Sequence, residues 1–432
     1  MYDYIIVGTG PTGLALAWYL SQYKQKILLI DQAPSLGGCH RVVRQNGLFG
    51  EHGPRVYLMT AAILKEMGKS WHYFFTPYKS GFISEGSKAL LNFNLREIFI
   101  LIKHFFSINE CYKEITMEEF LKYHQFSNQA TKFIDRICRT SDGAAIDRYT
   151  LYEFLQLINQ NGLYTIYQPK LPNDVGLFAF WEDKLLEHRV DIRLDTKVID
   201  FGVNTSVIES IVTNNGVFYG MNVILAIPPT SLVHVLHKSC IPDAFGDIDQ
   251  LKEWAHKTDY LYFNNITFHW KDKLDIQPVW GLAEDSEWGI ASIVLSDYMT
   301  FNDPRSQTVI SATLSLHNKS NYTGKTPFES SEQELINEIF RQMNIQFSLP
   351  PPDYAVPEYY EFGKTTAFQL TKYGNLDFYS KYYNLFICGT HNGYNNYSFT
   401  SMEAAVENAT ALLHYLIPYD PLFNYYFPIH VY

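Results

Sequence analysis

Apolar residues follow two contrasting patterns along this chain of 432 residues. Short continuous apolar runs at residues 4–7 and 26–31 predict strands that are buried on both faces, as in a parallel sheet. Other segments repeat apolar residues every three or four positions and predict amphipathic helices. Because strands and helices of these kinds are interspersed, we expect an α/β fold.

The middle of the chain divides into two regions with different periodicity. Helical spacing predominates in the first region, where helices are expected at residues 60–70, 95–107, 117–124, 128–138 and 149–160. Strand-like alternation predominates in the second, with strands expected at 261–270, 288–295 and 309–316, followed by a helix at 332–343. Further elements are a helix at 181–186, strands at 190–198, 222–229 and 384–389, and a helix at 401–413.

A glycine-rich turn joins the first strand to the next helix. Gly8 permits a tight turn, Gly10 lets the backbone approach a pyrophosphate, and Gly13 lets the helix pack close to the sheet. The phosphates are expected at the helix N-terminus, whose free N–H groups favour an anion. The second strand ends at Asp31, 18 residues after Gly13, where a carboxylate accepts hydrogen bonds from ribose hydroxyls and repels a 2′-phosphate. The expected contacts of this dinucleotide site also include Pro11, Thr12 and Gln32.

A second glycine loop follows Asp31 by six residues. Gly37 and Gly38, with Arg41 shortly after, resemble the extended motif of flavoproteins. Two glycines let the loop fold back along the phosphates of the cofactor, and an arginine can pair with them. The alternative is that Gly37 and Gly38 form only a tight turn.

The C-terminal part of the chain carries a separate signal. The apolar strand at 384–389 stops at Gly389, and Ser401-Met402-Glu403 opens a helix with Ser401 as its N-cap. This segment resembles the flavin-binding segment of the flavin-containing amine oxidase and phytoene desaturase superfamily. The resemblance implies that Gly389 and Thr390 lie near the FAD pyrophosphate and that the Met402 N–H points at the flavin pyrimidine ring.

The same superfamily has a strand valine whose backbone contacts adenine, followed by a strand that runs into Ala-x-Pro-Pro. Val198 and the segment 223–229 are similar to these features. The resemblance implies a Rossmann-type FAD-binding domain, discontinuous over 1–60, 172–235 and 375–417. A discontinuous α+β substrate domain, with a helical insertion and an antiparallel or mixed sheet, would comprise 61–171 and 236–374. Residues 418–432 would form an irregular tail.

Composition narrows the choice of partner and compartment. The net charge of −11 argues against a nucleic-acid partner, since a phosphate backbone requires a basic surface. Five scattered cysteines indicate reduced thiols in an intracellular, cytoplasmic protein, and the strand that begins near Met1 leaves no room for a signal peptide. No cysteine lies at 399–402, where some amine oxidases tether flavin, so FAD is expected to be non-covalent.

One apolar stretch admits two interpretations. Residues 98–106 are too short to span a bilayer, which takes ~20 apolar residues, and Lys103 and His104 interrupt them. We expect a core helix of the substrate domain, and the alternative is a patch that lies on a membrane surface near a substrate entrance.

The resemblance implies an FAD-dependent oxidoreductase that removes a hydride equivalent from an amine-like or other small or lipophilic C–H donor. Arg55, with Gly53 and Pro54, is expected beside the flavin ring, and Tyr394 on its substrate side. The alternatives are a structural role for Arg55 and core packing for Tyr394. His391 is a candidate acid or base, although a structural role is favoured for a loop histidine.

Departures from the superfamily pattern leave other functions open. Cys39 replaces the arginine that often follows the glycine pair, and Thr390 stands where amine oxidases commonly have an acid and nucleotide-sugar mutases an arginine. The alternatives are therefore a non-redox flavoenzyme similar to UDP-galactopyranose mutase, or a nucleotide-binding protein without turnover. No motif predicts a metal site, acyl transfer or P-loop chemistry.

Overall fold

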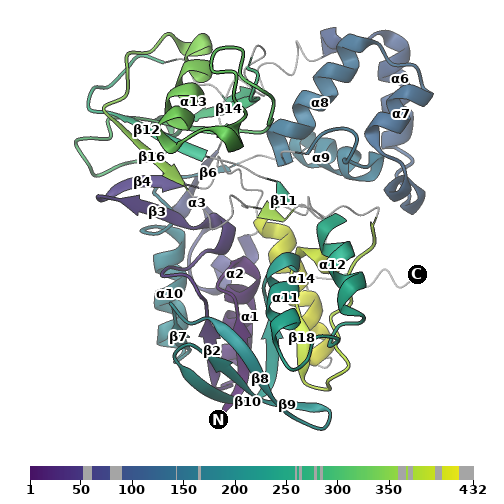
Figure 1. Ribbon diagram of the computed structural model, residues 1–432, viewed down its shortest axis with the longest axis vertical. Coiled ribbons are helices and arrows are strands. Elements are labelled where there is room, and N and C mark those ends of the chain that lie inside the picture. Colours follow the sequence, from purple (N-terminus) through teal and green to yellow (C-terminus); the bar gives the residue numbers. More distant parts are fainter. Residues whose placement is uncertain are drawn as a thin grey trace.

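Three parts make up the protein in the computed structural model (Figure 1). An α/β part contains the N-terminus, a smaller sheet covered by helix α13 lies above it, and a group of helices, α6 to α9, lies beside that sheet. The structure describes residues 1–51, 61–77, 90–142, 144–163, 167–257, 260–261, 265–276, 280–282, 286–358, 366–367, 373–394 and 401–417.

A seven-stranded sheet forms the centre of the α/β part, in the order β7-β2-β1-β10-β9-β8, with β18 also paired to β10. Its strands are β1 Tyr2–Val7, β2 Ile27–Ile30, β7 Asp191–Arg193, β8 Val198–Asn204, β9 Val207–Thr213, β10 Gly216–Leu225 and β18 Leu385–Ile387. The strands β7, β2, β1, β10 and β18 run parallel. The buried runs that predicted parallel strands at residues 4–7 and 26–31 are confirmed.

Two predicted strands differ from the structure. Residues 190–198 do not form one strand, because β7 ends at Arg193, Asp195 adopts a positive φ of 51°, and Val198 opens β8. Strand β10 begins six residues earlier than the predicted 222. Its first half pairs antiparallel with β9, and its second half pairs parallel with β1 and β18. One continuous strand therefore joins an antiparallel ribbon to the parallel sheet.

Helices cover both faces of this sheet. On one face the packing includes α1 Pro11–Gln22, α2 Ala61–Glu66, α3 Trp71–Phe74, α10 Leu177–Glu187 and α14 Met402–Leu416. On the other face, α11 Pro229–Lys238 and α12 Ile248–Lys257 pack through Leu232, Leu236 and Leu251 onto β1 and β2. The apolar packing of the α/β part thus extends to α12, beyond the predicted domain boundary at 235.

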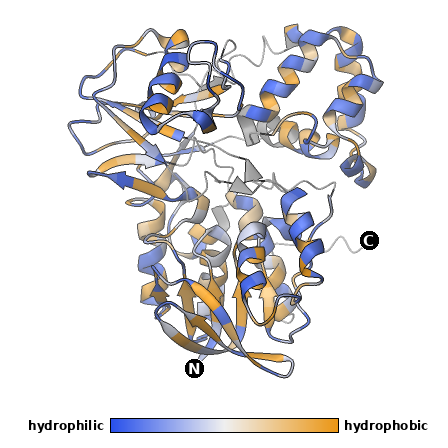
Figure 2. Ribbon diagram, viewed as in Figure 1, coloured by the Kyte–Doolittle hydropathy of each residue, from blue (hydrophilic) through white to orange (hydrophobic). Residues whose placement is uncertain are grey.

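The second sheet is antiparallel and has two different faces. Its order is β13 Trp280–Leu282, β14 Ile290–Val294, β15 Thr308–Leu314, β12 Asn265–Trp270 and β16 Tyr354–Glu358. One face packs Phe268 and Ile310 against Leu335 and Ile339 of α13 Glu332–Phe347. Polar and apolar residues alternate along β12, and Figure 2 shows residues of both kinds in this part of the molecule.

The predicted strand at 261–270 is divided between two sheets. Tyr260–Leu261 forms β11 and pairs with β17 Thr366–Ala367, whereas β12 begins at Asn265.

The polar face of β12, opposite α13, lies against the hairpin of β3 Val42–Gln45 and β4 Leu48–Glu51. His269 Nε2 lies 2.7 Å from the Phe49 carbonyl, and Asn265 donates to the Glu51 carbonyl. These polar contacts therefore connect the second sheet to the hairpin of β3 and β4.

The remaining part is helical, with a ribbon of β5 Phe75–Pro77 and β6 Tyr167–Pro169 at its base. Its helices are α6 Leu95–Phe105, α7 Met117–Tyr123, α8 Asn128–Asp142 and α9 Leu151–Leu163. Short 3-10 turns complete the described chain at Gly38–His40, Leu90–Asn92, Glu110–Glu114, Leu295–Asp297, Pro327–Glu329 and Thr390–Asn392. Among the described helices, none has the length and apolar character required to cross a membrane.

The expectation that residues 98–106 form a core helix is wrong for one face of that helix. Ile100, Leu101 and Phe105 pack against the helical core. Phe99 and Phe106 are instead 69% and 82% exposed. Apolar residues occur on both the packed and the exposed face of this helix, so the sequence pattern does not show which face is covered.

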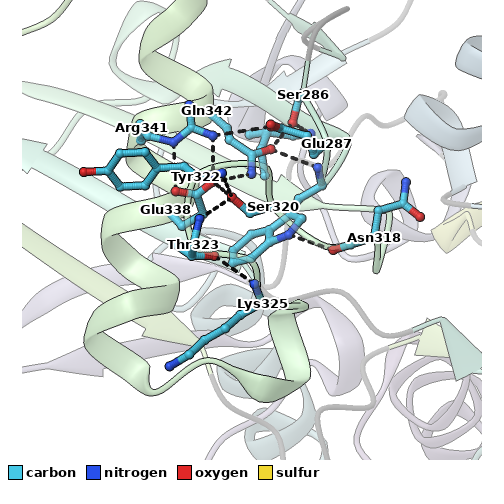
Figure 3. Close-up of polar contacts among 12 residues, drawn as sticks. Ser286, Glu287, Asn318, Ser320, Tyr322, Thr323, Lys325, Glu338, Arg341 and Gln342 are labelled. Carbon is cyan, nitrogen blue, oxygen red and sulfur yellow. Dashed lines mark hydrogen bonds and ion pairs between the residues drawn. The ribbon is translucent and has the colours of Figure 1, made fainter.

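A polar network fixes α13 against the loops beside the second sheet (Figure 3). The carboxylate of Glu338, 2% exposed, accepts from Arg341 at 2.7 and 2.8 Å, from Ser320 at 2.6 Å and from Gln342 at 2.8 Å. Burial alone would raise the pKa of Glu338, but these hydrogen bonds outweigh it and hold the pKa below its ordinary value. Gln342 Oε1 in turn accepts from Trp288 N.

We expect Glu338→Ala to lower the free energy of unfolding by about 2–4 kcal/mol, because it leaves buried donors without an acceptor. Chemical denaturation measures the change. Glu332→Gln, at the exposed start of the same helix, is the control and should stay within about 0.5 kcal/mol of the wild type. Equal effects of the two substitutions would contradict a stabilising network.

Protonation of His269 should destabilise the fold in acid. Burial lowers the pKa of His269 from its ordinary value of 6.5 to about 4, so the unfolded chain takes up a proton at higher pH than the folded one. Its contribution is complete above about pH 6.5 and is lost as the pH falls towards 4. We expect His269→Gln to reduce the loss of unfolding free energy between these values by on the order of 3 kcal/mol. The exposed His237→Gln is the control, and unchanged acid sensitivity of His269→Gln would contradict the assignment.

Candidate cofactor site

The parallel strands end at one level, and this edge collects the predicted cofactor residues. Val7 pairs with both Ile30 and Leu225, and Leu225 pairs with Ile387. The next residues continue the alignment, since Gly8 N donates to the Ile30 carbonyl, Ala226 N to Val7 and Cys388 N to Leu225. In open α/β sheets, ligands bind in the crevice outside such carboxyl ends.

Gly8 and Gly13 set how closely α1 approaches the sheet. Gly8 has a φ of +112°, and a Cβ there would lie 2.3 Å from the Ala226 carbonyl oxygen. A Cβ on Gly13 would lie 1.9 Å from the Gly8 carbonyl oxygen. Neither position has room for a side chain, so both glycines are needed to seat the helix.

The two glycine loops contact each other. Gly37 N donates to the Thr9 carbonyl at 2.9 Å, and a Cβ on Gly38 would lie 2.8 Å from Gly10 Cα. Gly37 and Gly38 both have positive φ values, of 112° and 56°. The loops thus form one surface of bare backbone beside the N-terminus of α1. Gly10 is the N-cap of that helix and provides no side-chain cap, so the first-turn N–H groups of Thr12 and Gly13 suit an external anion. This cradle fits a dinucleotide pyrophosphate.

Asp31 is held at the end of β2 by backbone donors. Its Oδ2 accepts from Thr9 N at 2.8 Å and from Thr9 Oγ1 at 2.7 Å, and its Oδ1 accepts from Ala33 N at 2.9 Å. Arg41 lies 3.8 Å from Oδ1 and donates to the Ser35 carbonyl. Arg41 and Asp31 therefore lie side by side in the structure. Gln32, the residue after Asp31, is exposed.

Val198 lies near Asp31 because the loop that precedes Val198 contacts the Asp31 backbone. Thr196 N donates to the Asp31 carbonyl at 2.8 Å, two residues before Val198 opens β8. Val198 is buried with Ile30 in the same apolar cluster. The predicted adenine-side residues, Asp31 and Val198, are thus close in space although far apart in sequence.

Helix α14 brings a second N-terminus to the same edge. Ser401 caps it by accepting from Ala404 N at 3.0 Å, as predicted. Thr12 Oγ1 donates to the Ala405 carbonyl at 3.3 Å, which joins the first turns of α1 and α14. Met402 is buried in the first turn, where helical geometry leaves its N–H without an intrahelical acceptor. Two helix N-termini from opposite ends of the chain therefore lie together.

Gly389 and Thr390 follow β18 at this edge. Gly389 N donates to Asn392 Oδ1 at 2.8 Å, and a Cβ on Gly389 would lie 2.5 Å from the His391 ring. His391 is buried, and burial lowers its pKa to about 3, so the ring is neutral across the physiological pH range. This environment agrees with the structural role favoured for His391.

Of the two predicted catalytic residues, Arg55 and Tyr394, the structure describes Tyr394. Tyr394 is 50% exposed, stacks on Phe378 with ring centroids 4.8 Å apart, and donates its N–H to Asn408 Oδ1. Asn408 lies about 9 Å along α14 from Met402 by helical rise. The backbone of Tyr394 is therefore beside the middle of the helix, and its ring lies against Phe378. Arg55, Gly53 and Pro54 lie outside the described residues.

Sequence analysis did not identify two residues of interest, Thr9 and Gln168. Thr9 makes both of the close contacts to Asp31 Oδ2, a role that its place inside the glycine motif could have suggested. Gln168 on β6 is fully buried, and neither of its amide atoms has a hydrogen-bond partner in the described structure. Such a group is costly unless a ligand or water satisfies it. The lone glutamine has no sequence signal.

Comparison with known proteins gives matches to the N-terminal part of the chain. Residues 6–74 match the family model of an NAD(P)-binding Rossmann-like domain. A 4,4'-diapophytoene desaturase from Methylomonas sp. is 38% identical over 63 residues. That match covers 15% of this chain and 12% of the desaturase, so the chain spans only a small part of that relative by sequence.

Solved structures match the chain over nearly its whole length. An engineered variant of putrescine oxidase superposes with a TM-score of 0.69 at 13% identity, covering 97% of this chain and 99% of that one. An oxidoreductase from Methanosarcina mazei gives 0.68 at 11% identity, covering 95% and 100%. Cyclohexylamine oxidase from Brevibacterium oxydans gives 0.64 at 13% identity, covering 96% and 99%. The chain therefore has a Rossmann-like domain within the fold of these amine oxidase structures.

Two alanine substitutions should separate cofactor binding from folding. A Cβ on Gly10 would have only Gly38 Cα nearby, at 3.8 Å, so Gly10→Ala should fold normally but lose at least about tenfold in dinucleotide affinity by obstructing the cradle. Gly13→Ala should instead lower stability by about 1–3 kcal/mol, because its methyl group meets the Gly8 carbonyl. Thermal unfolding and FAD titration of the apoprotein measure both effects. Wild-type affinity in Gly10→Ala would contradict the placement of the pyrophosphate.

Proposed function

We propose that this chain is an FAD-dependent oxidoreductase of the amine oxidase and desaturase type. It would remove a hydride equivalent from an amine-like or other small or lipophilic C–H donor. The observation that carries the proposal is the meeting of two helix N-termini with a double glycine loop at one sheet edge. The first helix N-terminus would hold the pyrophosphate, as in any Rossmann-type dinucleotide site, and the second would serve the isoalloxazine end of FAD.

Different residues at this edge would bind different parts of the cofactor. Gly8, Gly10 and Gly13, with Pro11 and Thr12, would hold the pyrophosphate at the start of α1. Gly37 and Gly38 would cover it from the opposite side, and Gly389 and Thr390 would approach it from β18. Asp31 Oδ1, which accepts one described hydrogen bond from Ala33, would accept another from a ribose hydroxyl.

The two ends of the cofactor would lie against different elements. Val198 and Gln32 would border the adenine and its ribose. Ser401 and Met402 would present the N-terminus of α14 to the pyrimidine edge of the flavin, where the helix end stabilises negative charge. Arg41 would neutralise Asp31 and lie close to the phosphates. Gly53, Pro54 and Arg55 stay predicted contacts of the ring.

Bound FAD would supply the acceptor for the hydride equivalent. The chain would position the donor and exclude water from it, next to the polar face of β12 and β15 that the hairpin of β3 and β4 covers. Asn265 accepts from Ser311 at 2.9 Å and from Thr313 at 2.6 Å on this face, so these side chains are fixed before any substrate arrives. Gln168 is a candidate for substrate contact because its amide is buried and unpaired among the described residues.

The cysteines support a non-covalent flavin. All five are free thiols. Cys388, the one at the end of β18, donates to the Asn408 carbonyl at 3.3 Å, and burial raises the pKa of its thiol well above the ordinary value. A neutral thiol engaged in this way is a poor nucleophile. The names of putrescine oxidase and cyclohexylamine oxidase support amines as the first substrates to test.

We expect the purified protein to be yellow, and acid precipitation to release all of its FAD into solution. Anaerobic addition of a panel of primary and secondary amines should bleach the flavin absorption with at least one amine. Stopped-flow absorbance measures the rate of bleaching, and the apoprotein is the control for absorbance not due to FAD.

Other outcomes would identify the alternatives. Flavin that resists every amine but, once reduced, isomerises a UDP-sugar would support a mutase instead. Bound flavin that is neither reduced nor used with either class would support a binding protein without turnover. Colourless protein that binds NAD and not FAD would contradict the proposal.

A further inference from the structure

Helix α6 exposes a continuous apolar stripe. Leu95 is 87% exposed, Phe99 69%, Ile102 49% and Phe106 82%. These positions follow one another by three or four residues and lie on one face of the helix. Leu91, 77% exposed, precedes them in the adjoining 3-10 turn. Single exposed apolar residues are normal, but a contiguous stripe of this kind marks a site of interaction.

The stripe is presented by a helix whose other face is firmly attached. Asn94 caps α6 by accepting from Glu97 N at 3.0 Å, and the Glu97 carboxylate accepts from Ser127 N at 2.6 Å. Ile100, Leu101 and Phe105 pack on the helical core. The exposed side chains therefore cannot be buried by rotation of α6 without breaking the cap and the core.

The charges on α6 favour an anionic partner. Arg96 and Lys103 are exposed, and each follows a stripe residue by one position, so both lie on the same flank of the stripe. Glu97 is the acidic residue of this helix, and it is fully buried on the opposite face. An apolar face bordered by cations is unusual in a chain with a net charge of −11. This pattern is typical of helices that lie in the headgroup region of a membrane.

The size of the stripe argues against a stable dimer. The four stripe side chains, about half to nine-tenths exposed, present on the order of 500 Å² of accessible surface. A stable protein interface buries about 800 Å² per partner. Insertion of a few large apolar side chains into a lipid surface does not require the larger area.

We propose that α6 docks the protein on an anionic lipid surface, with Leu95, Phe99, Ile102 and Phe106 among the acyl chains and with Arg96 and Lys103 at the headgroups. The helix lies at the outer edge of the helical part, away from the seven-stranded sheet (Figure 1), so a planar surface can reach it. Docking would leave the cofactor edge of that sheet free. The inference is independent of the proposed enzymatic activity.

Vesicle flotation of the full chain tests this directly. The wild type should float with vesicles of phosphatidylglycerol and phosphatidylcholine, and less with phosphatidylcholine alone. Phe99→Ser with Ile102→Ser should lower the partition coefficient at least about tenfold. Arg96→Gln with Lys103→Gln should abolish the preference for anionic vesicles and the sensitivity of binding to salt.

The control is Val217→Ser with Tyr219→Ser on β10, two apolar residues that are 48% and 57% exposed and lie outside the stripe. It should bind as the wild type does, and thermal unfolding should show all variants to be folded. The proposal is overturned if the wild type does not float with either vesicle, or if the stripe variant floats as well as the wild type. A dimer that the stripe variant dissociates, measured by light scattering without lipid, would assign the stripe to self-association instead.

Discussion

The contact between Gly13 and the carbonyl of Gly8 determines where α1 rests on the sheet. With 1.9 Å from an added Cβ to that oxygen, the helix lies closer to the strand ends than any side chain would permit. Its first turn is therefore held against β1, β10 and the Gly37-Gly38 loop at once. Asp31, Gly389 and Thr390 lie at the same edge as this contact, because they follow strands that end at one level.

Strand β18 and helix α14 complete the candidate cofactor site. Strand β18 adds to β10, and α14 then runs beside α1, tied to it by Thr12 and Ala405. Parallel strands supply carboxyl ends at one edge, and each helix that follows supplies a positive N-terminus there. Two distant segments can thus serve one long anionic cofactor. The hairpin of β3 and β4 then links this edge to the second sheet through Phe49, Glu51 and their partners on β12.

The sequence predicted those parts of the fold that local physics determines. Buried parallel strands appear as unbroken apolar runs, and positions with positive φ or close backbone contact, such as Gly8 and Gly37, must be glycine. The Ser401 cap was likewise visible because capping needs an oxygen at one position. The sequence therefore predicts the local backbone features on which the candidate site depends.

Features that depend on distant partners were not predictable. The division of 190–198 at Asp195 and of 261–270 between two sheets reflects pairing with strands far away in sequence. Apolar residues lie on both the exposed and the packed side of α6, so periodicity could not show which side is covered. Tyr394 was expected near the ring, and only its contacts with Phe378 and Asn408 locate it along α14. Gln168 becomes notable only through burial.

Hydrogen exchange of the backbone amides, followed by mass spectrometry with and without FAD, tests the central claim most directly. If one cofactor joins both ends of the chain, FAD should slow exchange in the peptides that contain Thr12 and Gly13 and in those that contain Met402 and Glu403, to a similar extent and at the same FAD concentration. Protection of the first segment alone, or of neither, would contradict the account.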